Sequence, residues 1–332
     1  MKAYLIRRLL LIIPSFIGIS LITFLMIQFM PGNPVMLRLQ KIQGSMAANS
    51  TITNQMIEDT KKLYGLDKPI WEQYVRWVGR MCVLDFGTSF KDRRPVRDKI
   101  LDALPVTIQI NVISIFLIYL FSVPIGVYSS THQRTWSDAV ITVVLFLLYS
   151  LPSFWVAMLF MYYFGGGVHF NWFPVYGLNS EGASQMTWLP WMKDRLWHLV
   201  LPVICLSYAG LAEISQFARS GMIDVIRQDY IRTARAYGFT EKVIVFKYAM
   251  RNSLIPLITL TATLLPALIG GSVIIENIFS IPGMGRLSFE AVLGRDYPVI
   301  MGVLTFSAFL TLAGLILSDI LYAVTDPRIK FE

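Results

Sequence analysis

The chain has 332 residues, of which 55% are hydrophobic and only 15% are charged, and its mean hydropathy is +0.56. A composition this apolar excludes a soluble globular domain and predicts an integral membrane protein. The formal net charge of +8 fits a basic rim that faces anionic lipid headgroups better than it fits nucleic-acid binding.

Six apolar runs are long enough to cross a hydrocarbon layer of about 30 Å as helices of roughly 20 residues. The runs cover residues 9–30, 106–130, 139–164, 196–212, 252–275 and 297–318. Pro152 predicts a kink in the third run, and His198 and Pro202 interrupt the short fourth run. The sequence therefore predicts an all-α membrane protein with six transmembrane helices.

The first run follows Lys2, Arg7 and Arg8, as a secretory signal would. Because no small-residue cleavage pattern comes before Pro31, we expect an uncleaved first span. Residues 1–30 are then an inner segment with the first span, residues 31–105 a large external segment, and residues 106–332 a five-span core.

Basic residues predict the orientation of these spans. With the N-terminus inside, the inner segments hold 13 Lys and Arg residues, whereas the two shorter outer loops hold 4. The long first loop carries twelve more, but segments of more than about 60 residues escape this rule. Both termini are therefore expected in the cytoplasm.

The external segment contains one helical pattern. Bulky residues at positions 71, 74, 75 and 78 share one face of a helix. We expect this face to pack on the protein's own spans, since such stripes are more often core than ligand site.

Polar residues within the spans have two interpretations. Asn111 and Ser114 lie in the second span, and Thr259 and Thr263 lie on one face of the fifth. They could line a substrate pathway, or they could hold helices together in the bundle. Both interpretations remain open.

The segment Arg219–Pro256 lies between two late apolar runs and overlaps the predicted coupling loop, residues 216–251. Asp229 is expected to cap a short helix that Gly238 ends, and Thr240 and Glu241 begin a second one. From Arg219 to Arg251 there are seven basic residues against three acidic ones, which predicts a cytoplasmic position.

Several kinds of chemistry are missing from the sequence. It contains no phosphate-binding P-loop, and its histidines, His132, His169 and His198, are scattered without metal-ligand spacing. We expect no catalytic, cofactor or metal site. The spans also lack the buried acid or base that a carrier driven by protons or sodium usually keeps, so energy is expected to enter through a partner protein.

The run from Arg232 to Gly238, followed eighteen residues later by Pro256, resembles the EAA loop of ATP-binding-cassette importer permeases in its oligopeptide and dipeptide form. Arg232 and Thr233 stand where the Glu and Ala of the loop's name would be. Further stretches resemble signatures of the same peptide permeases, with Leu84 standing where a Gly is common. These stretches are residues 66–77, 85–89, 276–286, 295–298, 319, 321–323 and 325–330.

The resemblance implies a type I importer permease fold in a bacterial or archaeal cytoplasmic membrane. Implied partners are a second homologous permease, two ATP-binding subunits that hold ATP and Mg²⁺, and an external solute-binding protein. The loop is the coupling helix of this family, with Arg232 and Arg235 as polar contacts to the ATPase and Ala234 and Ala236 as close-packing positions. The implied coupling residues are Asp229, Tyr230, Arg232, Thr233, Ala234, Arg235, Ala236 and Gly238.

The resemblance implies a peptide substrate, but the same family also handles oligosaccharides and nickel complexes. Two broader alternatives stay open: an ion-coupled carrier or channel would transport without ATP, and the two arginines could bind lipid phosphates instead of an ATPase. Transport in vesicles without ATP or partners would distinguish the first alternative.

Overall fold

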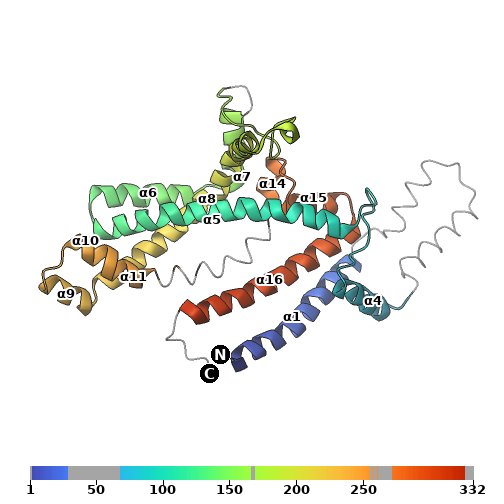
Figure 1. Ribbon diagram of the computed structural model, residues 1–332, viewed down its shortest axis with the longest axis horizontal. Coiled ribbons are helices and arrows are strands. Elements are labelled where there is room, and N and C mark those ends of the chain that lie inside the picture. Colours follow the sequence, from blue (N-terminus) through green and yellow to red (C-terminus); the bar gives the residue numbers. More distant parts are fainter. Residues whose placement is uncertain are drawn as a thin grey trace, which may run out of the picture. The chain divides into compact units, whose positions relative to one another are not determined.

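The computed structural model describes residues 2–28, 68–165, 169–254, 257, 260 and 271–325 (Figure 1). These residues form helices joined by turns, with an isolated antiparallel bridge between Thr88 and Pro95. The longer helices are α1 (Lys2–Gln28), α4 (Ile70–Cys82), α5 (Val96–Thr131), α6 (Trp136–Ser150), α7 (Ser153–Phe160), α8 (Trp188–Ile226), α9 (Asp229–Ala236), α15 (Met284–Leu293) and α16 (Tyr297–Thr325). Shorter elements are the π-helical turns η1 (Met161–Gly165) and η3 (Ile244–Ala249), the 3-10 turn η2 (Ala183–Gln185), and α10 (Glu241–Val243), α11 (Met250–Ser253) and α14 (Val273–Ile278).

The chain divides into two compact units, which we describe separately. The first contains Met1–Leu5, Ala103–Arg286 and Leu310–Glu332, and the second contains Ile6–Asp102 and Leu287–Phe309. α5 and α16 each contribute to both units.

Within the described residues, three helices are long and apolar enough to cross a membrane: α5, α8 and the Tyr297–Leu317 part of α16. α1 contains a shorter apolar helix, Leu10–Met26. The predicted fifth span, 252–275, lies mostly outside the described residues. The prediction of a helical membrane protein is confirmed, and the count of six spans stays a prediction.

The third predicted span is bent. α6 and the helix Ser153–Gly165 are together long and apolar enough to cross a membrane. They meet at an angle of 93° at Leu151 and Pro152. The predicted kink at Pro152 is therefore confirmed, and it is strong enough to divide the run into two helices, because proline cannot donate the backbone hydrogen bond that would continue the first.

α8 is much longer than the predicted fourth span, 196–212. Its 39 residues include Pro202, and it extends past both predicted ends. Similarly, α5 begins at Val96, before the apolar run that starts at Val106. The sequence pattern detects only the apolar part of each helix, whereas exposed charged side chains allow a helix to continue beyond it.

Buried apolar side chains hold the first unit together. They come from α5, α7, α8 and α14, and include Ile110, Ala157, Leu199 and Ile275. α5 and α8 also approach closely at Gly126, where an added Cβ would lie 2.5 Å from the Cβ of Ala218. Small residues at helix crossings allow this distance in membrane bundles.

An ion pair between a buried carboxylate and a half-buried arginine joins three helices beside that crossing. Asp138 at the start of α6 accepts hydrogen bonds from Nη2 of Arg219 in α8, at 2.9 Å, and from the hydroxyl of Ser129 in α5. The backbone N–H of Arg134 donates to the same carboxylate at 3.2 Å. Arg219, which the sequence pattern assigned to a basic inner rim facing lipid, is therefore part of the internal structure.

In the second unit, α4 packs against α1 (Figure 1). The ring centroids of Tyr74 and Trp77 lie 5.5 and 5.7 Å from that of Phe24, and the Tyr74 hydroxyl is 2.9 Å from Oγ of Ser20. Of the predicted face, Tyr74 packs on α1 as expected, whereas Val75 is exposed. Trp71, from the same predicted face, is also exposed.

Two segments that are far apart in the sequence meet in this unit. Asp296, which is buried before α16, accepts a hydrogen bond from the Ser89 hydroxyl at 2.5 Å and from the backbone N–H of Phe90 at 2.9 Å. The preceding turn places Leu84 at φ +56°, in the left-handed region that glycine favours. This explains why glycine is common before the Asp in the peptide-permease signature that residues 85–89 resemble.

We expect Asp138→Asn to lower the free energy of unfolding by roughly 3 kcal/mol, because Arg219 stays packed between helices without its counter-charge. Thermal unfolding in detergent measures this change. The double variant Asp138→Asn with Arg219→Gln should recover part of the loss. As a control, Asp85→Asn breaks an exposed pair with Arg80 and should cost less than about 1 kcal/mol. An unchanged midpoint in Asp138→Asn would contradict the role of the pair.

We expect Leu84→Gly to raise the thermal midpoint, because glycine removes about 1 kcal/mol of left-handed backbone strain. Leu84 is exposed, so little packing is lost. Leu84→Ala keeps the strained backbone and serves as the matched control. Equal midpoints for the glycine and alanine variants would show that the turn is not strained.

Candidate functional site

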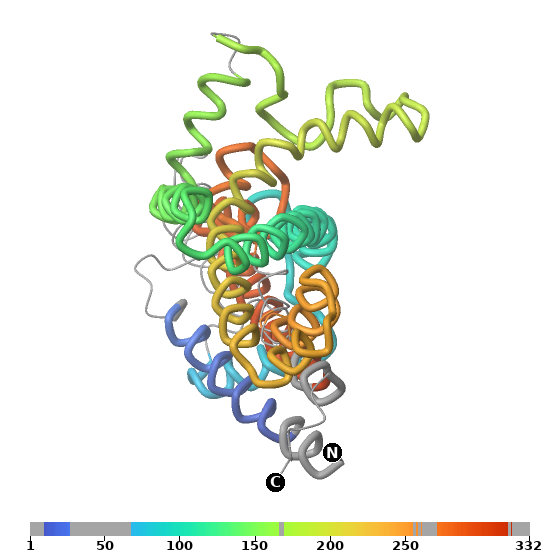
Figure 2. Tube along the Cα trace, turned by 90° about the vertical axis from the view of Figure 1, so that its left-hand side faces the viewer, coloured from blue at the N-terminus to red at the C-terminus, as the bar shows by residue number. Residues whose placement is uncertain are grey.

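The predicted coupling segment is a compact helical hairpin at the end of α8. α9 is followed by Gly238 at φ +79°, and then by α10, η3 and α11 (Figures 1 and 2). Glycine adopts this left-handed conformation without the steric cost that a Cβ would add. The predicted order of helix, break and helix is confirmed.

The second helix differs from the prediction of one regular helix, because its centre is the π-helical turn η3. A π turn has an extra residue per hydrogen-bonded ring, which rotates the side chains that follow. Ile244 and Ala249, at its two ends, both point into the protein as a result.

One face of α9 is buried in the protein itself. Ile231 and Ala234 pack in a cluster with Val127 of α5, Met222 of α8, and Ile244. This contact joins the hairpin to the ends of two long helices, so that a displacement of α9 is transmitted to α5 and α8.

The buried position of Ala234 corrects an expectation. This side chain was expected to allow another protein to approach closely, but it is needed for the close approach of α9 to its own helices. Ala236, which was expected to have the same role, is exposed. The helical period separates the two alanines because they are two positions apart and so lie on different faces.

The opposite face of the hairpin is exposed and carries both cations and aromatic rings. Arg232 and Thr233 are exposed on α9, and Tyr237 at its end is 80% exposed. Phe239 and Phe246 are exposed beyond the break. Aromatic and arginine side chains are the types that most often dominate protein interfaces. We call these five residues the hairpin surface.

Ion pairs stiffen the hairpin. Nε of Arg235 lies 2.8 Å from Oε1 of Glu241, across the break, and Nη1 of Arg232 lies 3.3 Å from Oδ1 of Asp229. The hydrogen bond from Arg235 holds the pKa of the Glu241 carboxyl below its usual range, so this pair stays charged at neutral pH. Asn252 also donates to the Tyr230 hydroxyl at 2.8 Å, which ties α9 to α11.

The predicted cap is wrong. Gln228 occupies the N-cap position of α9, and Asp229 is its first residue. The carboxylate of Asp229 therefore lies in the first turn, where the positive end of the helix dipole stabilises its negative charge. It also accepts a hydrogen bond from the guanidinium of Arg232.

Sequence reasoning missed a buried carboxylate, Glu276, which follows the predicted end of the fifth span. Its side chain is 2% exposed and accepts hydrogen bonds from the Thr107 hydroxyl and the backbone N–H of Arg286, each at 3.0 Å. Gly283 packs against it, where a Cβ would come within 2.5 Å of Oε2. These contacts fasten the segment 271–286 onto α5. The glycines near Glu276 in the sequence, Gly271, Gly283 and Gly285, were the signal that could have indicated a tightly packed acidic residue.

The residues predicted to line a substrate pathway are only partly described. Ser114 is buried, and its carbonyl accepts a hydrogen bond from Ser207 of α8 at 3.3 Å. Asn111 is half-buried and has a partner of its own. Thr259 and Thr263 lie outside the described residues. The bond from Ser207 uses the backbone of Ser114, whose own buried hydroxyl has no hydrogen-bond partner among the described residues, so it does not decide between the two interpretations.

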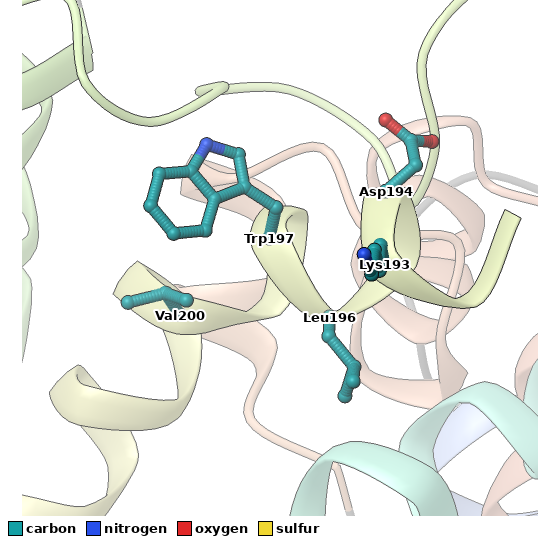
Figure 3. A pocket seen from close by; sticks show the side chains of 5 residues that line it. All are labelled: Lys193, Asp194, Leu196, Trp197 and Val200. Carbon is teal, nitrogen blue, oxygen red and sulfur yellow. The ribbon is translucent and has the colours of Figure 1, made fainter. Parts of the chain in front are cut away.

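An open groove of about 460 Å³ lies along the first turns of α8 (Figure 3). Its lining includes Lys193, Asp194, Leu196, Trp197 and Val200, whose side chains point in different directions. The Asp194 carboxylate is already engaged, since the hydroxyl of Ser180 donates to it at 2.6 Å. A binding site needs convergent polar groups, so we assign no ligand to this groove.

Comparison with known proteins identifies the family. Residues 122–331 match the family described as "Binding-protein-dependent transport system inner membrane component", and residues 1–111 match the N-terminal family of such membrane components. The oligopeptide transport system permease protein AppB of Bacillus subtilis is 38% identical over 332 residues, which is all of both chains. The dipeptide transport system permease protein DppB of Alkalihalophilus pseudofirmus is 35% identical over 345 residues, again with full coverage of both.

A third relative is the peptidoglycan transport system permease protein YejB of Agrobacterium fabrum, which is 33% identical, with 100% of this chain and 99% of the relative covered. Among solved structures, an inward-facing MetNI methionine ABC transporter is similar with a TM-score of 0.54 at 15% identity, covering 69% of this chain and 96% of that one. This likeness shows the fold, that of a type I ABC importer permease. The chain therefore belongs to the family of binding-protein-dependent transport system inner membrane components, and it is a permease subunit of an ABC transporter.

Proposed function

We propose that this chain forms half of the passage through which an ATP-driven importer moves peptides across the cytoplasmic membrane. The observation that carries the proposal is the similarity, over the full length of both chains, to permeases named for oligopeptide and dipeptide transport. The chain would have six spans with both termini in the cytoplasm, and residues 31–105 would lie outside.

ATP hydrolysis would occur in partner subunits. One of two ATPase subunits would dock on the hairpin surface, a second homologous permease would complete the passage and hold the other ATPase, and an external binding protein would deliver the peptide. The exposure of Tyr237 and Arg232 supports this docking, as does the rigid connection of α9 to α5 and α8. ATP-driven closure of the ATPases would then move the inner ends of both helices together.

Import is tested in vesicles that contain the assembled complex, with a radiolabelled tripeptide delivered by the binding protein. We expect uptake of the tripeptide only when ATP is present on the side of the vesicle membrane that carries the ATPase subunits. Competition by unlabelled peptides, oligosaccharides, nickel complexes and peptidoglycan fragments identifies the substrate class. Accumulation by this chain alone, without ATP, would instead support an ion-coupled carrier.

We expect Tyr237→Ala to weaken docking by roughly 2 kcal/mol, because an exposed aromatic side chain at an interface centre is a common binding hot spot. Co-purification of the ATPase subunits with the permease measures the loss. Trp136→Ala is the matched control, since Trp136 is 83% exposed in a different helix, α6. Equal recovery of ATPase in both variants would contradict docking at the hairpin surface.

A pair of alanine variants separates docking from internal packing. Ala236→Glu should reduce ATPase co-purification and leave the thermal midpoint unchanged, because this position is exposed. Ala234→Glu should lower the midpoint, since it places a charge in the buried cluster of α9. If the arginines merely bound lipid phosphates, Ala236→Glu would leave the amount of ATPase unchanged.

A further inference from the structure

α4 has an apolar arc that is wider than its contact with α1. Tyr74, Trp77 and Met81 lie on the half that is covered within the second unit. Trp71 and Val75 lie on the adjoining half, and they are 68% and 59% exposed. A monomeric soluble surface rarely leaves such a group of large side chains in water.

The position of α4 along α1 indicates what surrounds this exposed half. The Tyr74 hydroxyl contacts Ser20 at 2.9 Å and the carbonyl of Ile17 at 3.3 Å. Ser20 lies within the apolar stretch Leu10–Met26 of α1, six residues before the end of that stretch, a rise of about 9 Å. Because a tyrosine side chain reaches only part of this distance, α4 lies beside the apolar part of α1.

The remaining face of α4 is charged. Arg76 and Lys68 lie 2.8 and 3.4 Å from the Glu72 carboxylate, so that one acid is shared by two cations and a positive charge is left over. An apolar face bordered by cations is the pattern of helices that lie in the plane of a membrane interface, where lysine and arginine reach the lipid phosphates.

We propose that α4 is an interfacial membrane helix whose Trp71 and Val75 side chains insert among the lipid acyl chains, while Arg76 and Lys68 lie at the level of the phosphates. The exposed side chains of α1 at the same height, Ile22 and Met26, would continue the same lipid-facing surface. The helix would hold the segment 85–95 that follows it at a constant height above the bilayer. The inference rests on the proposed assignment of α1 as the first span.

Spin labels on single cysteines test the proposal in the assembled transporter, in vesicles of phosphatidylethanolamine and phosphatidylglycerol. The native Cys82 is replaced by Ser, and Cys205 is buried and stays unlabelled. Val75→Cys reports on the apolar face, and Arg76→Cys, one residue along the same helix, is the matched control. We expect dissolved O₂, which partitions into lipid, to collide with the label at position 75 more often than an aqueous nickel chelate does, and the reverse at position 76.

Two outcomes at position 75 would overturn the proposal. Frequent collision with the nickel chelate would place this face in water, and an immobilised label with few collisions of either kind would place it under a protein surface, of this chain or of another. Ile22→Cys on α1 separates a failure of the first-span assignment from a failure of the interfacial-helix proposal. If the label at position 22 reports water, the span assignment fails; if it reports lipid and position 75 does not, only the interfacial helix fails.

Discussion

The packing of Ile231 and Ala234 against α5 and α8 is the contact on which the proposed coupling to an ATPase depends. A short helix that projects from a membrane bundle transmits force only if one of its faces is held by the bundle. Because packed side chains resist compression, a push on the exposed face of α9 reaches Val127 and Met222 directly. A looser hairpin would absorb the same push in its own deformation.

The bundle end that receives this push is stiffened by polar groups. The ion pair of Asp138 and Arg219 joins α5, α6 and α8 in the turns beside Gly126, where α5 and α8 are in close contact. Such a pair is retained only where its hydrogen-bonding capacity is filled, and here Ser129 and the Arg134 N–H complete it. The coupling hairpin and the ion pair thus share two helix ends, those of α5 and α8.

Two other buried carboxylates connect distant segments of the described chain. Glu276 binds Thr107 of α5, and Asp296 binds Ser89, each with an additional backbone N–H donor. Asp138 and Asp296 lie just before an apolar run, and Glu276 lies just after one. Directional bonds to a charged acceptor fix a turn in position where apolar packing alone would allow it to slide.

The sequence by itself determined that the chain is helical and membrane-embedded, because a run of about 20 apolar residues is enough for a helix to cross the hydrocarbon layer. It also predicted the break at Gly238 and the bend at Pro152, since both follow from the backbone chemistry of single residues. It could not show that Ala234 is buried while Ala236 is exposed, or that Arg219 pairs with Asp138, because those outcomes depend on which helices become neighbours. Only the tertiary structure decides such contacts, as they join residues that are far apart in the chain and whose types alone allow several partners.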